Sequence, residues 1–320
     1  MTGIGTIFRK ELSDHFSSYR FTILFALIAM ASLITAYMAG IGLREELAGI
    51  AKPKFVFLML FTATGSLFSL VQFVAFFGPL IGLLLGFDSI NRERSSGTLS
   101  TLVSQPIYRD SIINGKFLAG VVTISSILLS ITLVVSGLGL SLIGVVPGPE
   151  EVWRIFFYLI ISIVYISFWL AVSILFSILF RGVATSALAT LAVWIFFSFF
   201  IPIGASVVAN AVVPLDIQKQ ENPELLVKRI KLERGVSLIS PMQLYNDSTA
   251  IVIDPTRKTT KAFVVMGPLE RMSQERFQRP LELLQSVHIV IPHIITLISI
   301  TFICFGLSYA IFMKQEIRSF

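Results

Sequence analysis

Six stretches of this chain contain no aspartate, glutamate, lysine or arginine, and each is long enough to cross a membrane. They cover residues 21–43, 55–87, 117–149, 155–180, 182–215 and 283–313. About 20 apolar residues cross the roughly 30 Å hydrocarbon layer of a bilayer as a helix. A soluble protein of 320 residues cannot bury six such segments. We therefore expect an all-α integral membrane protein with six transmembrane helices.

The composition agrees with a membrane protein, since 55% of the residues are hydrophobic and only 14% are charged. The net charge of +6 does not indicate nucleic-acid binding, because lysine and arginine collect in the loops and the spans add no acid to balance them. The first apolar stretch follows twenty residues and is too long for a cleaved signal, so we expect it to be retained as a span. The single cysteine, Cys304, excludes a disulfide framework and a cysteine metal site.

The distribution of lysine and arginine predicts the orientation. With the N-terminus in the cytoplasm, the short inner segments carry ten of these residues and the short outer loops carry four. The remaining eleven lie in 216–282, which is too long for the rule to weigh. We expect a multi-pass protein of the cell membrane with both termini in the cytoplasm.

This orientation divides the chain into four parts. Residues 1–20 are expected to form an amphipathic helix along the inner leaflet, because Ile4, Ile7, Phe8, Leu12 and Phe16 share one face; a plain cytoplasmic helix is the alternative. Residues 21–215 hold the first five spans, including the cytoplasmic loop 88–116. Residues 216–282 form a small extracytoplasmic insertion, and 283–320 hold the last span and a cytoplasmic tail.

Several stretches are longer than one crossing needs, so we expect breaks in them. Residues 55–65 are expected to lead into a crossing at 66–87. Gly137 with Gly139, and Pro202 with Gly204, mark further interruptions. Three other glycines, Gly78, Gly82 and Gly86, repeat every fourth residue, which predicts a helix face that allows close approach of another helix.

The insertion 216–282 is polar and rich in proline. Residues 223–234 predict an amphipathic helix opened by a proline, 261–266 a short strand, and 270–286 a second helix. About 67 residues are marginal for an independent core, so we expect this cap to lean on the spans.

The loop 88–116 is short, basic and charged between two apolar stretches. We expect a short helix over 95–104 that ends before Pro106, with Glu93 and Arg94 paired to each other or to a soluble partner. On these features alone, the alternative is an ordinary cytoplasmic loop.

The amino-acid sequence of this loop resembles the intracellular coupling segment of ABC-2 type transporter permeases. The matching residues are Asp88, Ile90, Glu93, Arg94, Gly97, Thr98, Leu99, Pro106, Arg109, Gly115 and Lys116. Ser240, Pro241, Tyr245 and Pro255 match more loosely the segment before the last span. The chain departs from the family at Ser95 and Ser100, where acidic residues are frequent. The resemblance implies that these loop residues, with the exception of Ile90, couple the spans to a separate ATPase.

Catalytic sites are not evident. A phosphate-binding loop that ends in Gly115 and Lys116 would need a glycine at position 110, where this chain has Asp110. We therefore expect a permease without its own ATPase site or cofactor. His288 and His293 stand five apart without a glutamate partner, so no metal site is expected. No acidic residue lies inside the charge-free stretches, which leaves proton relays without a candidate.

The resemblance implies a permease subunit that works as a homodimer or related heterodimer with two ATPase copies. It is most similar to permeases of multi-copper enzyme maturation and of drug or sodium export, which favours export. The alternatives are a membrane scaffold or sensor whose external cap binds a partner, and a gradient-driven secondary transporter. An ATPase that co-purifies would discriminate between them. The sequence does not indicate the substrate.

Overall fold

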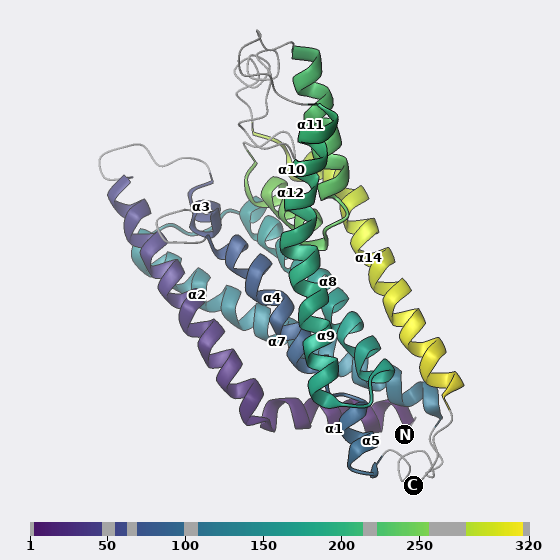
Figure 1. Ribbon diagram of the computed structural model, residues 1–320. Coiled ribbons are helices and arrows are strands. Elements are labelled where there is room, and N and C mark those ends of the chain that lie inside the picture. Colours follow the sequence, from purple (N-terminus) through teal and green to yellow (C-terminus); the bar gives the residue numbers. More distant parts are fainter. Residues whose placement is uncertain are drawn as a thin grey trace.

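A computed structural model describes residues 3–46, 55–62, 69–98, 108–213, 223–255 and 280–315. Within these ranges the chain is helical and contains no strand. Figure 1 shows a bundle of long helices, with α1 lying across one end and α11 and α12 gathered at the other. The helices, in chain order, are α1 (Gly3–Ser17), α2 (Tyr19–Glu46), α3 (Val56–Thr62), α4 (Leu70–Gly86), α5 (Asn91–Ser95), α7 (Arg109–Ile143), α8 (Pro149–Leu179), α9 (Val183–Ile195), α10 (Ile201–Val212), α11 (Pro223–Ser237), α12 (Pro241–Ile253) and α14 (Leu283–Lys314).

Six segments among the described residues are long and apolar enough to cross a membrane, which confirms the six predicted spans. They correspond to α2, α4 with its extension to Ser95, α7, α8, α9 with α10, and α14. The expected strand over 261–266 and most of the helix over 270–286 lie outside the described residues.

Helix α8 is the centre of the bundle and contacts α4, α7, α9, α12 and α14. Its inward face is polar and aromatic as well as aliphatic, with Arg154, Tyr158, Ser162, Tyr165, Trp169, Ser173 and Ser177 all buried. These residues recur every three or four positions, so they form one stripe along the helix. The other spans are therefore arranged around a helix that offers hydrogen bonds along its whole length.

Helices α4 and α8 approach each other closely, as the glycine spacing predicts. A Cβ added at Gly82 would lie 2.7 Å from the backbone oxygen of Ile166, and one at Gly86 would lie 2.7 Å from Cβ of Ser173. Gly78 meets Ile166 in the same way, at 2.9 Å. The prediction of a close-packed glycine face is confirmed.

The breaks in the long stretches only partly follow the sequence. The lead-in is the separate helix α3, and α4 starts afresh at Leu70 behind a capping box formed by Ser69 and Gln72. In contrast, Gly137 and Gly139 do not interrupt α7, which ends at Gly144, a residue with φ of 65°. A glycine can adopt this left-handed conformation without steric cost.

The fifth span is interrupted before Pro202 rather than at it. A π-helical turn, Phe196–Phe200, joins α9 to α10, and the backbone N–H of Ile201 bonds the carbonyl of Phe196. Proline has no N–H to continue the regular pattern. The extra residue in this turn absorbs the mismatch, so the span continues instead of stopping.

The insertion before the last span leans on the spans, as the sequence predicts. Helix α11 opens at Pro223 as expected. Helix α12, however, is buried against α8 and α14, and Tyr245 stacks on Tyr165 with ring centroids 4.5 Å apart. Because Leu244, Tyr245 and residues 251–253 are buried, this part of the cap belongs to the core of the bundle.

Candidate functional site

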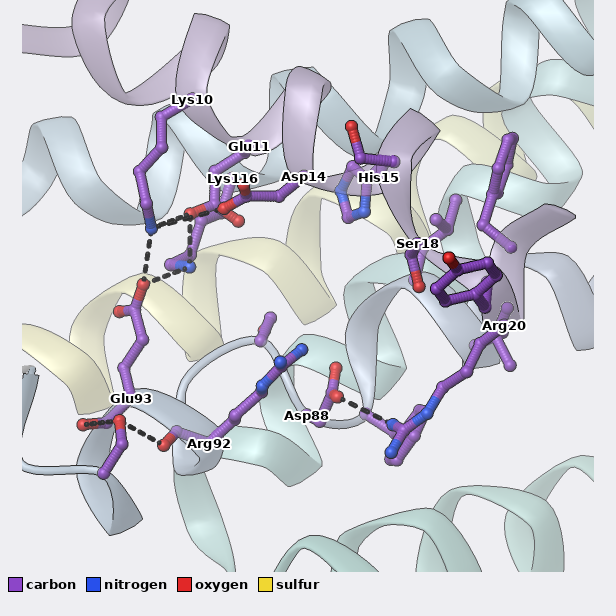
Figure 2. Close-up of a pocket in the computed structure, with 18 of the residues that line it drawn as sticks. Lys10, Glu11, Asp14, His15, Ser18, Arg20, Asp88, Arg92, Glu93 and Lys116 are labelled. Atoms are coloured by element: carbon purple, nitrogen blue, oxygen red, sulfur yellow. Dashed lines mark hydrogen bonds and ion pairs between the residues drawn. The ribbon is translucent and has the colours of Figure 1, made fainter.

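Lys116, in the second turn of α7, connects three elements at the end of the bundle where α1 lies. Its Nζ is 2.9 Å from Oε1 of Glu11 in α1 and 3.0 Å from Oε1 of Glu93 in α5. Lys10 also binds Glu93, at 3.3 Å, and Glu11, at 3.2 Å. Figure 2 shows both lysines directed towards the two carboxylates. Two cations and two anions therefore hold α1, α5 and α7 together.

Burial makes this network strong. The side chain of Lys116 is only 5% exposed and that of Glu11 10%. Burial alone would raise the pKa of Glu11, but attraction to Lys116 and Lys10 outweighs it and lowers this pKa below its ordinary value. For Lys10, burial lowers the pKa, but Glu11 and Glu93 raise it by more. Both groups thus stay charged near neutral pH.

The buried face of α1 is not the purely apolar face that the sequence predicts. Ile7 is buried against Gly115 of α7, where an added Cβ would lie 2.8 Å from the Cγ2 atom of Ile7. Glu11, one turn later, is buried on the same face, whereas Phe16 is 48% exposed. The helix therefore attaches to α7 by one close apolar contact and one ion pair.

A cleft of about 820 Å³ opens beside this network, between α1, the end of α4 and α5. The carboxylate of Asp88 binds Arg20 at the start of α2, at 3.3 Å. Burial lowers the pKa of His15, which also lines the cleft. Figure 2 places Arg92 in the cleft as well. The walls are mixed in charge, which suits a polar protein segment better than an apolar ligand.

The segment after α4 is anchored on the end of α8. The hydroxyl of Ser177 accepts hydrogen bonds from the backbone N–H groups of Ile90, at 2.9 Å, and Asn91, at 3.2 Å. The side-chain amide of Asn91 donates to the carbonyl of Gly182 at 3.3 Å. Helix α5 is therefore fixed to α8 as well as to α1 and α7.

The described part of this loop holds a short helix that precedes the predicted one. Helix α5 spans Asn91–Ser95, and Gly97 follows it with φ of 73°. The hydroxyl of Thr98 donates to the carbonyl of Glu93 at 3.3 Å. A left-handed glycine ends a helix, so α5 stops before Gly97, and Thr98 after it is helical again. Leu99, Pro106 and the rest of the predicted helix lie outside the described residues.

Arg94 and Arg109 meet at the end of α14, which the sequence did not predict. Arg94 donates to the side-chain oxygen of Gln315, and Arg109 donates to its backbone oxygen at 3.0 Å. The side-chain amide of Gln315 donates to the carbonyl of Ile178 at 3.1 Å. Glu93 and Arg94 therefore bind Lys116 and Gln315, and the expected pairing between them is wrong.

The structure thus divides the predicted site residues into three groups. The first group contacts α1 and consists of Glu93, Gly115 and Lys116. The second group, Arg94 and Arg109, binds Gln315. In the third, Asp88 binds Arg20. The sequence analysis missed Glu11, although one signal was present. Glu11 is four residues after Ile7, so it lies on the apolar face of the helix and needs a buried partner.

A second ionic cluster lies at the opposite end of α8. Arg154 is fully buried, and its guanidinium binds Glu150 at 2.9 Å, the carbonyls of Val252 at 2.9 Å and Leu281 at 2.6 Å, and Ser286 at 3.2 Å. Glu151 accepts from the backbone N–H of Phe57 at 3.1 Å.

These contacts correct the view that the spans hold no acid. Helix α8 starts at Pro149, so its candidate span includes Glu150 and Glu151. Both carboxylates already have hydrogen-bond partners. Across the described ranges, no group of three or more histidine, cysteine or acidic side chains is arranged to hold a metal ion.

Comparison with known sequences gives a family for this arrangement. Residues 5–317 match the sequence model of a family described as ABC-2 family transporter protein. Two similar curated proteins are each described as a probable ABC transporter permease protein, NosY. The one from Stutzerimonas stutzeri is 32% identical over 151 residues, which are 45% of this chain and 50% of that protein. The one from Pseudomonas aeruginosa is 34% identical over 118 residues, 37% of this chain and 38% of that protein. The chain therefore spans at most half the length of these relatives.

Proposed function

The chain belongs to the ABC-2 family of transporter proteins, and from this membership we propose that it is the permease subunit of an ATP-binding-cassette exporter. A separate ATPase docks on α1, α5 and the cleft between them. Two permease subunits, identical or related, and two ATPase subunits form the complete transporter. The observation that carries this proposal is the buried ion pair network in which Lys116 joins Glu11 and Glu93.

A docking site for an ATPase must transmit the movement of the ATPase to the membrane spans. An element held by one flexible loop would move alone when a partner pushes it. Helix α5 is instead held at three points, on α1, α7 and α8, by Glu93, Asn91 and their partners. Displacement of α5 or α1 therefore displaces the spans that they contact.

The interior of the bundle offers a path for this displacement along α4 and α8. Side chains of α8 bind the backbone of α4 and the turn after it at three levels. Tyr165 donates to the carbonyl of Ala75 at 2.9 Å, Ser173 donates to that of Leu83 at 2.9 Å, and Ser177 binds the N–H groups of residues 90 and 91. Hydrogen bonds between helices inside a membrane contribute about 0.6 kcal/mol each on average. Together with the glycine contacts, they favour movement of α4 and α8 as one unit.

The extracytoplasmic end receives this movement through Arg154. Its four partners lie on α8, α12, the start of α14 and the segment just before it. Helix α12 is tied to α8 again by Ser162 and Tyr245, whose hydroxyl oxygens are 2.9 Å apart. A displacement that begins at α5 would thus reorient α12 and α14, and so open or close the pathway at the far side.

The arrangement of the termini supports the proposed cytoplasmic docking face. Figure 1 shows the start of α1 and the end of α14 at the end of the bundle where α5 lies. Most arginines and lysines of the short loops belong to this same end, which favours its location in the cytoplasm. Export is the proposed direction because the loop resembles those of export permeases.

The proposal is tested by reconstitution with the ATPase that co-purifies from native membranes. Glu93→Ala combined with Arg94→Ala should reduce ATPase association and stimulated ATP hydrolysis by about tenfold or more, because interface charges of this kind contribute a few kcal/mol. The matched control is Glu233→Ala with Arg234→Ala, the adjacent acid–base pair in α11, which should leave hydrolysis unchanged.

Two results would overturn the proposal. Substrate flux driven by an ion gradient through the purified chain alone would identify a secondary transporter. A partner that binds only the extracytoplasmic helices, with no ATPase in the complex, would identify a scaffold or sensor.

A further inference from the structure

Three arginines from different parts of the chain converge at the end of α14. Arg94 and Arg109 both bind Gln315. Arg181, in the turn after α8, is close enough to Arg94 for their like charges to repel. We name these three residues, Arg94, Arg109 and Arg181, the Gln315 cluster.

This cluster has more positive charge than the described residues around it neutralise. The C-terminal ends of α8 and α14 lie here, and each helix end carries only about half a negative charge. No carboxylate of the described residues forms an ion pair with any member of the cluster. A guanidinium has five N–H donors, whereas Arg94 and Arg109 each make one hydrogen bond to the described part of the chain. The cluster therefore offers several donors to an anion.

The residues around the cluster indicate what kind of anion it binds. The arginines lie where α5 and α8 end and where α7 begins, beside the end of α14, which is the depth of the lipid headgroups if these helices span the bilayer. Leu179 at the end of α8 is 48% exposed, and Met313 near the end of α14 is 40% exposed. A basic group at the end of a span with exposed apolar side chains beside it matches both parts of a phospholipid. Basic pockets between spans on the cytoplasmic side bind anionic headgroups in this way.

We propose that the Gln315 cluster is a binding site for the phosphate headgroup of an anionic phospholipid in the cytoplasmic leaflet. The planar fork of arginine binds phosphate oxygens through two parallel hydrogen bonds, which a lysine cannot do. Free phosphate would use the same donors but would leave Leu179 and Met313 without a partner. The site depends on the position of this end of the bundle at the inner leaflet. It does not depend on the docking of an ATPase.

The test uses the purified full-length chain in nanodiscs of phosphatidylcholine alone or mixed with phosphatidylglycerol, without any ATPase. Native mass spectrometry counts the phosphatidylglycerol that stays bound after release from the disc. The variants are Arg181→Gln, and Arg94→Gln with Arg109→Gln and Arg181→Gln together. The matched control is Arg92→Gln, which removes an arginine of the same helix α5 that lines the cleft instead of the cluster.

We expect the wild-type chain to retain phosphatidylglycerol in preference to phosphatidylcholine. Affinity should fall about fivefold for each arginine removed, since a basic residue near an anionic surface contributes about 1 kcal/mol. Arg181→Gln keeps the test valid if the triple variant unfolds, because Arg181 is exposed and makes no hydrogen bond or ion pair with the described residues. Arg92→Gln should retain the lipid.

Three results would overturn the inference. The first is retention of phosphatidylglycerol by Arg181→Gln and the triple variant at the wild-type level. The second is displacement of the lipid by inorganic phosphate, which would identify a site for the free anion. The third is equal retention of phosphatidylglycerol and phosphatidylcholine by the wild-type chain, which would show that the site does not select an anionic headgroup.

Discussion

The ammonium group of Lys116 lies 2.9 Å from the carboxylate of Glu11, although 105 positions separate the two residues in the sequence. This ion pair attaches the amphipathic helix α1 to the start of α7. Glu93 completes it from a third element. Because Lys116 and Glu11 are both nearly buried, each charge depends mainly on its ionic partners.

Removing Lys116 should release α1. The variant Lys116→Met leaves Glu11 and Glu93 buried without their main partner, and breaking a buried ion pair in this way costs about 3–5 kcal/mol. We expect faster protease cleavage of α1 and a lower unfolding temperature. Adding Glu11→Gln and Glu93→Gln should restore part of the loss, because no carboxylate then remains unpaired. Lys10→Met is the control, and its effect should be smaller because Lys10 is half exposed. Equal effects of Lys10→Met and Lys116→Met would contradict this account.

The attachment of α1 should weaken in mild acid because of His15. Burial lowers the pKa of His15 in the folded chain, so the unfolded chain binds a proton more readily. The stability of the folded state is then fully present above the ordinary histidine pKa of about 6.5 and decreases as the pH falls below it. Hydrogen exchange of α1 measured between neutral and mildly acid pH should show this loss, and His15→Gln should remove it. The same loss in His15→Gln would assign it to other groups.

The close contact between α4 and α8 should not tolerate a single methyl group. Gly82→Ala places a Cβ 2.7 Å from a backbone oxygen of α8, and overpacking of this kind costs about 1–3 kcal/mol. Gly137→Ala is the matched control, since no atom lies within 4 Å of its added Cβ. It should be neutral, or stabilise α7 by up to about 1 kcal/mol. Thermal unfolding of the two variants in detergent checks the difference, and equal unfolding temperatures would disprove the steric argument.

Arg154 should be more important for the stability of this end of α8 than its partner Glu150. Arg154→Met removes a buried cation and leaves two carbonyls and Ser286 without their donor. We expect a loss of about 3–5 kcal/mol. Glu150→Gln should cost less, because Glu150 is 34% exposed and water can replace it. Denaturation in mixed micelles compares them, and a larger effect of Glu150→Gln would contradict the assignment.

The proposed orientation is tested by cysteine labelling in a Cys304→Ser background. Leu225→Cys in α11 should react with an impermeant maleimide added outside intact cells, because Leu225 is 51% exposed. Tyr108→Cys, at a position 82% exposed before α7, should react only after the membrane is opened. The reverse pattern would invert the topology, and with it the docking face.

Much of the fold follows from local sequence patterns. The six spans are evident because a segment without charge and longer than the bilayer has few alternatives. The glycine face of α4 is evident because three small residues at a spacing of four share one side of a helix. Helix α11 starts at the predicted proline for an equally local reason, since proline at the first position gives up no hydrogen bond.

Partner choice, in contrast, depends on distances that local patterns do not contain. The sequence identified Glu93, Arg94 and Lys116 as important but offered Glu93 and Arg94 only each other or a soluble partner. The structure pairs them with Lys116 and Gln315. Likewise, Arg154 has the appearance of an ordinary loop charge in the sequence, yet it is fully buried.

The sequence by itself thus determined the class of protein, the number of spans and the position of the charged loop, because each rests on the hydrophobicity of a continuous segment. Only the tertiary structure decided that Glu11 belongs to the candidate site, that α12 lies in the core and that the arginines converge on Gln315. A buried charge must have a partner in three dimensions, and which residue becomes that partner is set by how the helices pack.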